Sequence, residues 1–173
     1  VNGFITSTKT RNNACTNPGF EDTSFYLGQA TYSTELKRSG TRSAKIVGTG
    51  GGQWAYLSTS DVSTVPQSVA PGDVVYMEAW LYGSPSNTIA SSGFYLYAQG
   101  LDGTLTVNLE NLYAGSLAAN TDRNGVWTKW SGYRELTHAD IRYVQLGIYT
   151  TAAAGEVYYL DDPVIRFVTD ASE

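Results

Sequence analysis

The chain has 173 residues, of which 42% are hydrophobic and 16% charged, and its formal net charge at pH 7 is −5. This length suits one domain with a sizeable core. The acidic balance excludes nucleic-acid recognition, which needs clustered cations against phosphates. The longest apolar runs are strand-sized, so we expect no membrane span. The 18 glycines and 13 tyrosines favour strands and tight turns.

The predicted elements are strands in which apolar and polar residues alternate, bounded by Gly, Pro, Asn, Asp or Ser. In chain order they cover residues 43–48, 53–58, 73–83, 93–100, 104–109, 126–136, 141–150 and 156–168. Residues 23–37 and 111–123 lack a clean period, and we expect long loops there. Short turns between many strands predict an all-β fold, an antiparallel two-sheet β-sandwich of the jelly-roll type.

The domain organisation follows from the same pattern. We expect residues 1–13 to form a lead-in segment, residues 14–168 the β-sandwich, and residues 169–173 a tail. The sequence starts at Val1 with neither an initiator Met nor a leader, so the chain is either processed or, as we expect, a segment of a longer protein. Cys15 is the single cysteine, so an internal disulfide is excluded.

Catalytic patterns are sparse. His138 is the only histidine and lies in a polar turn, without a nucleophile elbow or the Cys/His spacing of a zinc site. Glycoside hydrolysis needs two carboxylates across a sugar. Glu78 is the best candidate for one, but no second carboxylate on its face is evident. We expect a protein that is not an enzyme, with a small glycoside hydrolase as the less favoured alternative.

Aromatic side chains on the strands form the strongest signal. In strand 73–83, Val75, Met77, Ala79 and Leu81 define a core face by alternation. We expect the opposite positions of this and neighbouring strands to form one exposed aromatic face that stacks on sugar rings, with amide and carboxylate groups for hydroxyls. The candidate ligand-binding residues are Trp54, Tyr56, Tyr76, Glu78, Trp80, Tyr82, Tyr95, Tyr97, Gln99, Gln145 and Tyr149. The alternatives are structural aromatics and a protein interface.

Two tryptophans three positions apart cannot both point to the same face of one strand. Trp127 and Trp130 belong to the strand predicted at 126–136. Because successive side chains of a strand point to opposite faces, these two cannot share one face. We expect one of them in the core and the other exposed.

Several short motifs, taken in order, resemble the carbohydrate-binding modules of families 4, 9 and 22. They are TNPGFED at 16–22, SGTRSAKI at 39–46, VAPGDVVYMEAW at 69–80, GVWTKWSG at 125–132 and YYLDDPVI at 158–165. The resemblance implies a jelly-roll sandwich that binds a glycan without catalysis.

The same resemblance implies a structural calcium ion near the ends of the domain. Its ligands would be Glu21, the backbone of the loop around Gly40, and Asp161 or Asp162. Calcium takes six to eight hard oxygen ligands and tolerates irregular loops. The alternative is that these acidic residues are turn or edge-strand charges.

The opening RNNACTNPGFE at 11–21 is similar to the start of such modules in minor tail or fibre proteins of bacteriophages that infect actinobacteria. This implies a glycan of the host surface as partner and an extracellular or virion (tail) location. A module attached to an enzyme would instead be secreted. The competing hypothesis is a structural or assembly domain of a phage tail, which contacts neighbouring chains and has no sugar ligand.

Overall fold

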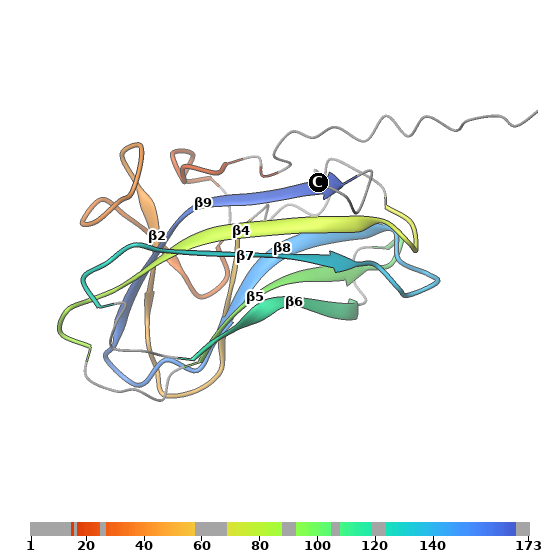
Figure 1. The fold of residues 1–173 in the computed structure, drawn as a ribbon. Helices are drawn as coiled ribbons and strands as arrows, with labels where there is room; N and C mark the ends of the chain where they lie inside the picture. Colours follow the sequence, from red (N-terminus) through yellow and green to blue (C-terminus); the bar gives the residue numbers. More distant parts are fainter. Residues whose placement is uncertain are drawn as a thin grey trace, which may run out of the picture.

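The computed structural model describes residues 15, 17–24, 27–57, 69–87, 93–104, 108–118 and 124–168. Within these ranges the chain forms nine strands and no helix (Figure 1). The strands are β1 (Thr31–Ser33), β2 (Ser43–Val47), β3 (Gln53–Tyr56), β4 (Val74–Gly83), β5 (Gly93–Leu101), β6 (Asn108–Ala118), β7 (Thr128–Glu135), β8 (Tyr143–Thr150) and β9 (Val157–Val168). The described ranges contain no helix that is long and apolar enough to cross a membrane.

The strands form two sheets. The order is β1-β2-β9-β4-β7 in the five-stranded sheet and β3-β8-β5-β6 in the four-stranded sheet. Every pairing of neighbouring strands is antiparallel. The two sheets lie face to face as layers (Figure 1). The predicted all-β antiparallel sandwich is therefore confirmed.

The core lies between the two sheets, and alternation decides which side chains enter it. Val75, Met77, Ala79 and Leu81 of β4 are each at most 1% exposed, as predicted. From the four-stranded sheet, β5 and β8 contribute the buried residues Phe94, Leu96, Ala98, Leu146 and Ile148. Full burial of a large apolar side chain of this kind stabilises the fold by roughly 1.5–3 kcal/mol.

The two tryptophans separate as their spacing requires. Trp130 is 4% exposed and belongs to the core, whereas Trp127 is half-buried and packs against Tyr82 with ring centroids 5.5 Å apart. The predicted core position is confirmed for Trp130, whereas Trp127 precedes β7 and is half-buried rather than exposed.

Two predicted loops contain strands. β1 occupies Thr31–Ser33 within 23–37, and β6 runs from Asn108 to Ala118, through most of the segment predicted as a loop at 111–123. The strand predicted at 104–109 is part of β6, which begins at Asn108. The register of the β5–β6 pair shifts at two points, between Leu96 and Tyr97 and between Gly100 and Leu101. Such bulges interrupt strict alternation, so the pattern hid this strand.

The lead-in segment and the tail predicted at the two ends of the chain remain predictions. The lead-in segment at 1–13 and the tail at 169–173 lie outside the described residues. All nine described strands lie between residues 31 and 168, within the segment predicted as the sandwich.

Candidate functional site

The outward face of the four-stranded sheet carries three adjacent rows of side chains, set by the register of its strands. In the first row, Tyr149 of β8 pairs with Trp54 of β3 and Tyr95 of β5. The second row, one step further along the sheet, consists of Tyr56, Gly147, Tyr97 and Tyr113. The third row consists of the amides Gln145, Gln99 and Asn111. The sheet therefore places aromatic rings beside hydrogen-bonding amides.

These rows form a groove of two adjoining hollows. The first has a volume of about 420 Å³ and is lined by Trp54, Tyr56, Tyr97, Gln99, Asn111, Tyr113 and Tyr149. The second, of about 460 Å³, is lined by Tyr95, Tyr113, Tyr149 and Thr151. Tyr113 and Tyr149 line both hollows, so we name the combined feature the aromatic groove. Its size is typical of a small-molecule or oligosaccharide subsite.

Four tyrosine rings of the aromatic groove contact one another in a continuous series. The ring centroid of Tyr95 lies 6.0 Å from that of Tyr149 and 5.7 Å from that of Tyr113, which lies 5.9 Å from Tyr97. These distances are typical of tilted and edge-to-face aromatic pairs. Trp54 and Tyr113 remain 46% and 42% exposed. The groove thus offers accessible ring faces on a pre-organised support.

Tyr97 forms part of the floor of the groove. It is 7% exposed. Burial raises the pKa of its hydroxyl to about 12, with smaller contributions from Tyr56 and Tyr113. The hydroxyl therefore stays protonated at neutral pH and can donate a hydrogen bond to a ligand oxygen.

Two glycines make room for these rings. A Cβ at Gly147 would lie 2.8 Å from Cζ of Tyr97, and a Cβ at Gly52 would lie 2.5 Å from the hydroxyl oxygen of Tyr149. Neither residue is among the glycines with positive φ. Space for a ring, rather than backbone conformation, accounts for the missing side chain at both positions.

The predicted single aromatic face is wrong, because the candidate residues divide between two opposite faces. Tyr76, Glu78, Trp80 and Tyr82 lie on β4, which belongs to the five-stranded sheet, whereas β5 belongs to the other sheet. Alternation specifies which side of its own sheet a residue occupies. It does not specify which sheet the strand joins. Since each sheet turns its apolar side inward, the outward residues of β4 and β5 point away from each other.

Cationic side chains cover Trp80 and Tyr76 on the outward side of the five-stranded sheet, which we name the capped face. The guanidinium of Arg38 lies 3.9 Å from the ring centroid of Trp80, and that of Arg166 lies 4.5 Å from Tyr76. Glu78 accepts a hydrogen bond from the Tyr76 hydroxyl, and its carboxylate forms an ion pair with the ammonium of Lys129 at 3.2 Å. These ring faces are already occupied by cation–π partners.

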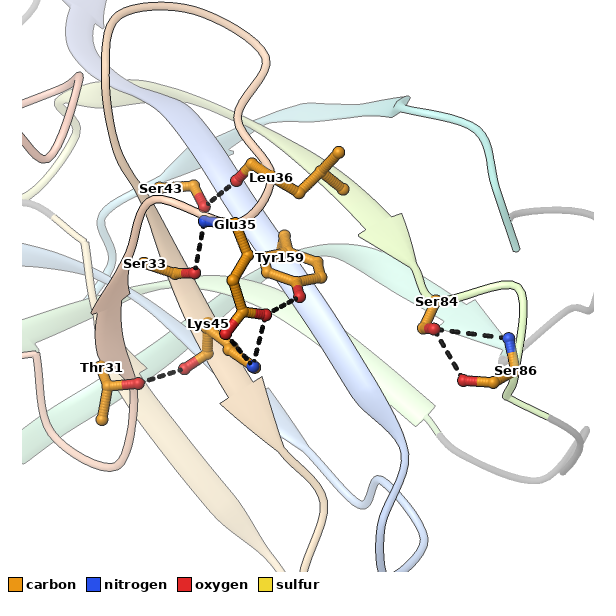
Figure 2. Close-up of polar contacts among 9 residues, drawn as sticks. All are labelled: Thr31, Ser33, Glu35, Leu36, Ser43, Lys45, Ser84, Ser86 and Tyr159. Carbon is orange, nitrogen blue, oxygen red and sulfur yellow. Dashed lines mark hydrogen bonds and ion pairs between the residues drawn. The ribbon is translucent and has the colours of Figure 1, made fainter.

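A second network continues the capped face along β2 and β9. The Glu35 carboxylate lies between the ammonium of Lys45, at 2.7 Å, and the hydroxyl of Tyr159, also at 2.7 Å (Figure 2). The lysine holds the pKa of the Glu35 carboxyl below its ordinary value, chiefly through this hydrogen bond. The segment that follows β1 thus folds onto the sheet through its charged residues.

The residues proposed as calcium ligands gather around the loop at 38–41. The Glu21 carboxylate accepts hydrogen bonds from the amide of Thr41, at 2.5 Å, and from its hydroxyl. Gly40, with φ of 58°, lies so close to this carboxylate that a side chain there would collide with it. The family resemblance also brought Glu21 and this loop together. The hydrogen bonds from Thr41 lower the pKa of the Glu21 carboxyl.

Asp161 approaches the same loop from β9. It is wholly buried, and its carboxylate accepts the amides of Arg38 at 2.7 Å, Ser39 at 3.1 Å and Asp162 at 2.9 Å. Asp162 bonds the Ser39 hydroxyl at 2.5 Å and forms an ion pair with the Arg38 guanidinium. Burial raises the pKa of Asp161, and the neighbouring Asp162 charge adds to this. A cation beside Asp161 would relieve the cost of ionising it.

These residues fit calcium better than a metal that needs a full set of side-chain ligands. In the described ranges, no cluster of three or more His, Cys, Asp or Glu could hold a metal ion. An ion held by Glu21 and Asp161 would take its remaining ligands from backbone carbonyls and water, which calcium accepts and structural zinc does not.

The aromatic groove includes lining residues that the sequence pattern missed. They are Asn111, Tyr113 and Thr151, together with the two supporting glycines, Gly52 and Gly147. Asn111 and Tyr113 alternate with half-buried Leu112 and Ala114, which is a strand signal within the predicted loop. Assigning that strand would have brought both residues to this face.

Comparisons with known proteins identify the fold. No family model matches the sequence, and no curated protein sequence is significantly similar to it. The CBM22-1 xylan-binding domain of Paenibacillus barcinonensis Xyn10C matches with a TM-score of 0.61 and 17% identity, over 95% of this chain and 100% of that domain. A family 16 carbohydrate-binding module matches with a TM-score of 0.54 and 14% identity, over 88% of this chain and 99% of its own.

A third structure comes from a virus. The enzymatically active domain of bacteriophage CBA120 tailspike protein 4 matches with a TM-score of 0.59 and 11% identity, over 90% of this chain but 21% of that one. The chain therefore has the jelly-roll fold of carbohydrate-binding modules, as the sequence motifs implied. Among the structures with this fold are modules of families 16 and 22.

Proposed function

We propose that this chain is a non-catalytic carbohydrate-binding module that recognises a glycan through the aromatic groove. The observation that carries this proposal is the sequence of rows on one sheet face, with two rows of rings followed by one of amides. A pyranose ring has apolar C–H faces that stack on aromatic rings and a rim of hydroxyls that suits amides. The xylan-binding domain that shares the fold supports a polysaccharide as the ligand class.

The absence of turnover is part of this proposal. Glycosidases hold a pair of carboxylates on either side of the scissile bond. Neither hollow of the aromatic groove is lined by an Asp or Glu from the described residues. Glu78, the acid that the sequence singled out, lies on the other sheet in an ion pair with Lys129. These placements support binding without hydrolysis.

Attachment of a bacteriophage to its host is the biological setting we propose. The match to a tailspike domain supports a location on the virion tail or outside the cell. An accessory module of a secreted enzyme would have the same fold and groove. The second candidate function is an assembly domain, in which the exposed Trp54 and Tyr113 would pack against a neighbouring chain.

We also propose a structural calcium ion held by Glu21 and Asp161. The support is a buried carboxylate with a raised pKa and a second carboxylate that contacts the same loop. A bound ion would join residues near the start of the domain to β9. Its removal would therefore weaken the fold rather than the ring surface.

A glycan array that contains xylan and β-1,4-galacto-oligosaccharides tests glycan binding directly. We expect defined hits that Tyr113→Ala removes. Tyr133→Ala is a matched control, because Tyr133 is 44% exposed but lies on β7 in the other sheet. A folded domain that binds nothing on the array would contradict the proposal. Self-association of that domain through the Trp54 and Tyr113 surface would then favour the assembly function.

A further inference from the structure

The aromatic groove contains no charged side chain among the residues that the structure describes around it. Its lining consists of Trp54, Tyr56, Tyr95, Tyr97, Gln99, Asn111, Tyr113, Tyr149 and Thr151. Every polar group in this set is an amide, a hydroxyl or an indole N–H. These groups form neutral hydrogen bonds with hydroxyls, ring oxygens and acetamido groups.

Among the described residues, the cations that stand over aromatic rings lie on the opposite side of the sandwich. Arg38, Lys45 and Arg166 each stand over a ring of the capped face, and Lys129 pairs there with Glu78. The chain as a whole has a formal charge of −5. An anionic sugar that entered the aromatic groove would thus approach a negative protein without meeting a compensating cation in the described lining.

The energetic consequence is unfavourable for a charged ligand. A carboxylate, sulfate or phosphate that loses water needs a paired cation or several aimed donors. Anion sites in proteins accordingly use Arg or Lys, which form charge-assisted and often bidentate hydrogen bonds. A cationic amino sugar would equally need a carboxylate, and the described lining has none.

We infer that the aromatic groove selects uncharged glycans and discriminates against the same chains when they carry carboxylate, sulfate or phosphate groups. This inference rests on the proposed glycan-binding function and specifies its ligand class. It predicts neutral polysaccharides as ligands and excludes uronic-acid polymers and phosphate-bearing wall polymers.

Chemically matched polysaccharide pairs test the inference. Native affinity electrophoresis would compare hydroxyethylcellulose with carboxymethylcellulose, and arabinoxylan with glucuronoxylan. The best neutral array ligand with a primary hydroxyl would be compared with its C6-carboxylate derivative. For each neutral polymer that retards the protein in the gel, we expect an affinity at least about tenfold higher than that for its anionic partner. The affinity for the neutral polymer should change by less than about twofold between about 0.05 and 0.5 M salt, because screening acts on charges.

A gain-of-function variant makes the test independent of any single ligand. Gln99→Lys and Asn111→Lys place a cation at the lining, and we expect both to raise the affinity for the anionic member of a pair. Ser131→Lys is the matched control, because Ser131 is exposed on β7 in the other sheet. It should leave both affinities unchanged.

The outcomes separate the inference from the proposed function. Equal or tighter binding of the anionic partners, if Tyr113→Ala abolishes it, would overturn the inference and leave glycan binding in place. A folded protein that binds no member of the pairs or of the array would overturn both. Neutral-selective binding that Tyr133→Ala but not Tyr113→Ala removes would also refute the inference, because it would place the ligand on the capped face.

Discussion

The two outward faces of this sandwich contain similar residues but differ in what covers them. In the aromatic groove, Trp54 and Tyr113 are 46% and 42% exposed, and Tyr113 contacts the rings of Tyr95 and Tyr97. On the capped face, Trp80 and Tyr76 lie under the guanidinium groups of Arg38 and Arg166. The first face has ring surface left for a ligand. On the second face, the rings of Trp80 and Tyr76 are already in contact with intramolecular cations.

The difference shows that aromatic content alone does not identify a binding face. Tyr and Trp suit strands because their side chains pack well on a pleated, half-buried surface. Whether they bind a ligand depends on the neighbours that tertiary structure places over them. Here the charged segment after β1 folds over the five-stranded sheet. The described lining of the aromatic groove, on the four-stranded sheet, carries no charge.

The largest expected difference between the faces is in glycan affinity. Tyr113→Ala should weaken binding of the best array ligand by about 2 kcal/mol, or about thirtyfold, because a central aromatic contact is lost. Tyr133→Ala should leave the affinity unchanged. Isothermal titration calorimetry on both variants measures the contrast, and equal losses would show that the capped face also binds.

Asp161 allows a test of the capped face through stability. In calcium, Asp161→Asn should lower the free energy of unfolding by about 2 kcal/mol, because hydrogen bonds to a charged group are lost. The measurement is chemical denaturation of both proteins in calcium and in chelator. Magnesium serves as the ion control, since it favours tighter octahedral sites. Identical stability of the wild type in all three conditions would contradict the calcium proposal.

The same residue predicts the sign of a pH effect. Burial raises the pKa of Asp161 above its ordinary value of 3.8, so the folded state favours its protonated form. In chelator, its contribution to stability should be greatest below pH 3.8 and should fall as the pH rises through the folded-state pKa. Bound calcium should remove this fall, because the ion stabilises the carboxylate. The Asp161→Asn variant should lack both trends, so its difference in stability from the wild type should carry them.

Gly147→Ala tests the support beneath the groove. The new methyl group would lie 2.8 Å from Cζ of Tyr97, so the ring must move. We expect about a tenfold loss of affinity, or about 1.4 kcal/mol, with a smaller effect on melting temperature. Gly51→Ala is a suitable control, because the atom nearest to its added Cβ is 4.0 Å away. Unchanged binding by Gly147→Ala would remove Tyr97 from the site.

Arg38→Ala is expected to have the smallest effect. It removes the cation over Trp80 and an exposed ion pair with Asp162, which together contribute about 0.5–1 kcal/mol to stability. Trp80 should become more accessible to acrylamide quenching while glycan affinity stays the same. An increase in affinity would mean that uncovering the capped face creates a second site.

Much of the fold could be predicted from local alternation, and the failures have local causes. The core face of β4 was predicted residue by residue. β1 has only three residues, which is too short for a period to show. β6 pairs with β5 across two register shifts, so its alternation is continuous only over a few residues around Asn111–Ala114.

The candidate site was predictable only in part. Seven of its expected ligand-binding residues lie on the outward face of the four-stranded sheet, namely Trp54, Tyr56, Tyr95, Tyr97, Gln99, Gln145 and Tyr149. The other four, on β4, lie on the capped face. Alternation identified the outward positions correctly on both strands. It could not assign the strands to their sheets.

The sequence by itself determined the all-β class and the inward and outward positions of its clear strands, and its family resemblance pointed to the acidic residues near the loop at 38–41. These properties depend on a period of two residues and on short motifs, which are local. Only the tertiary structure decided that β3 pairs with β8 and β2 with β9, and hence which aromatics share a face. Such pairings join segments far apart in the chain through backbone hydrogen bonds. Because any strand can form these bonds, side-chain identity alone does not select the partner.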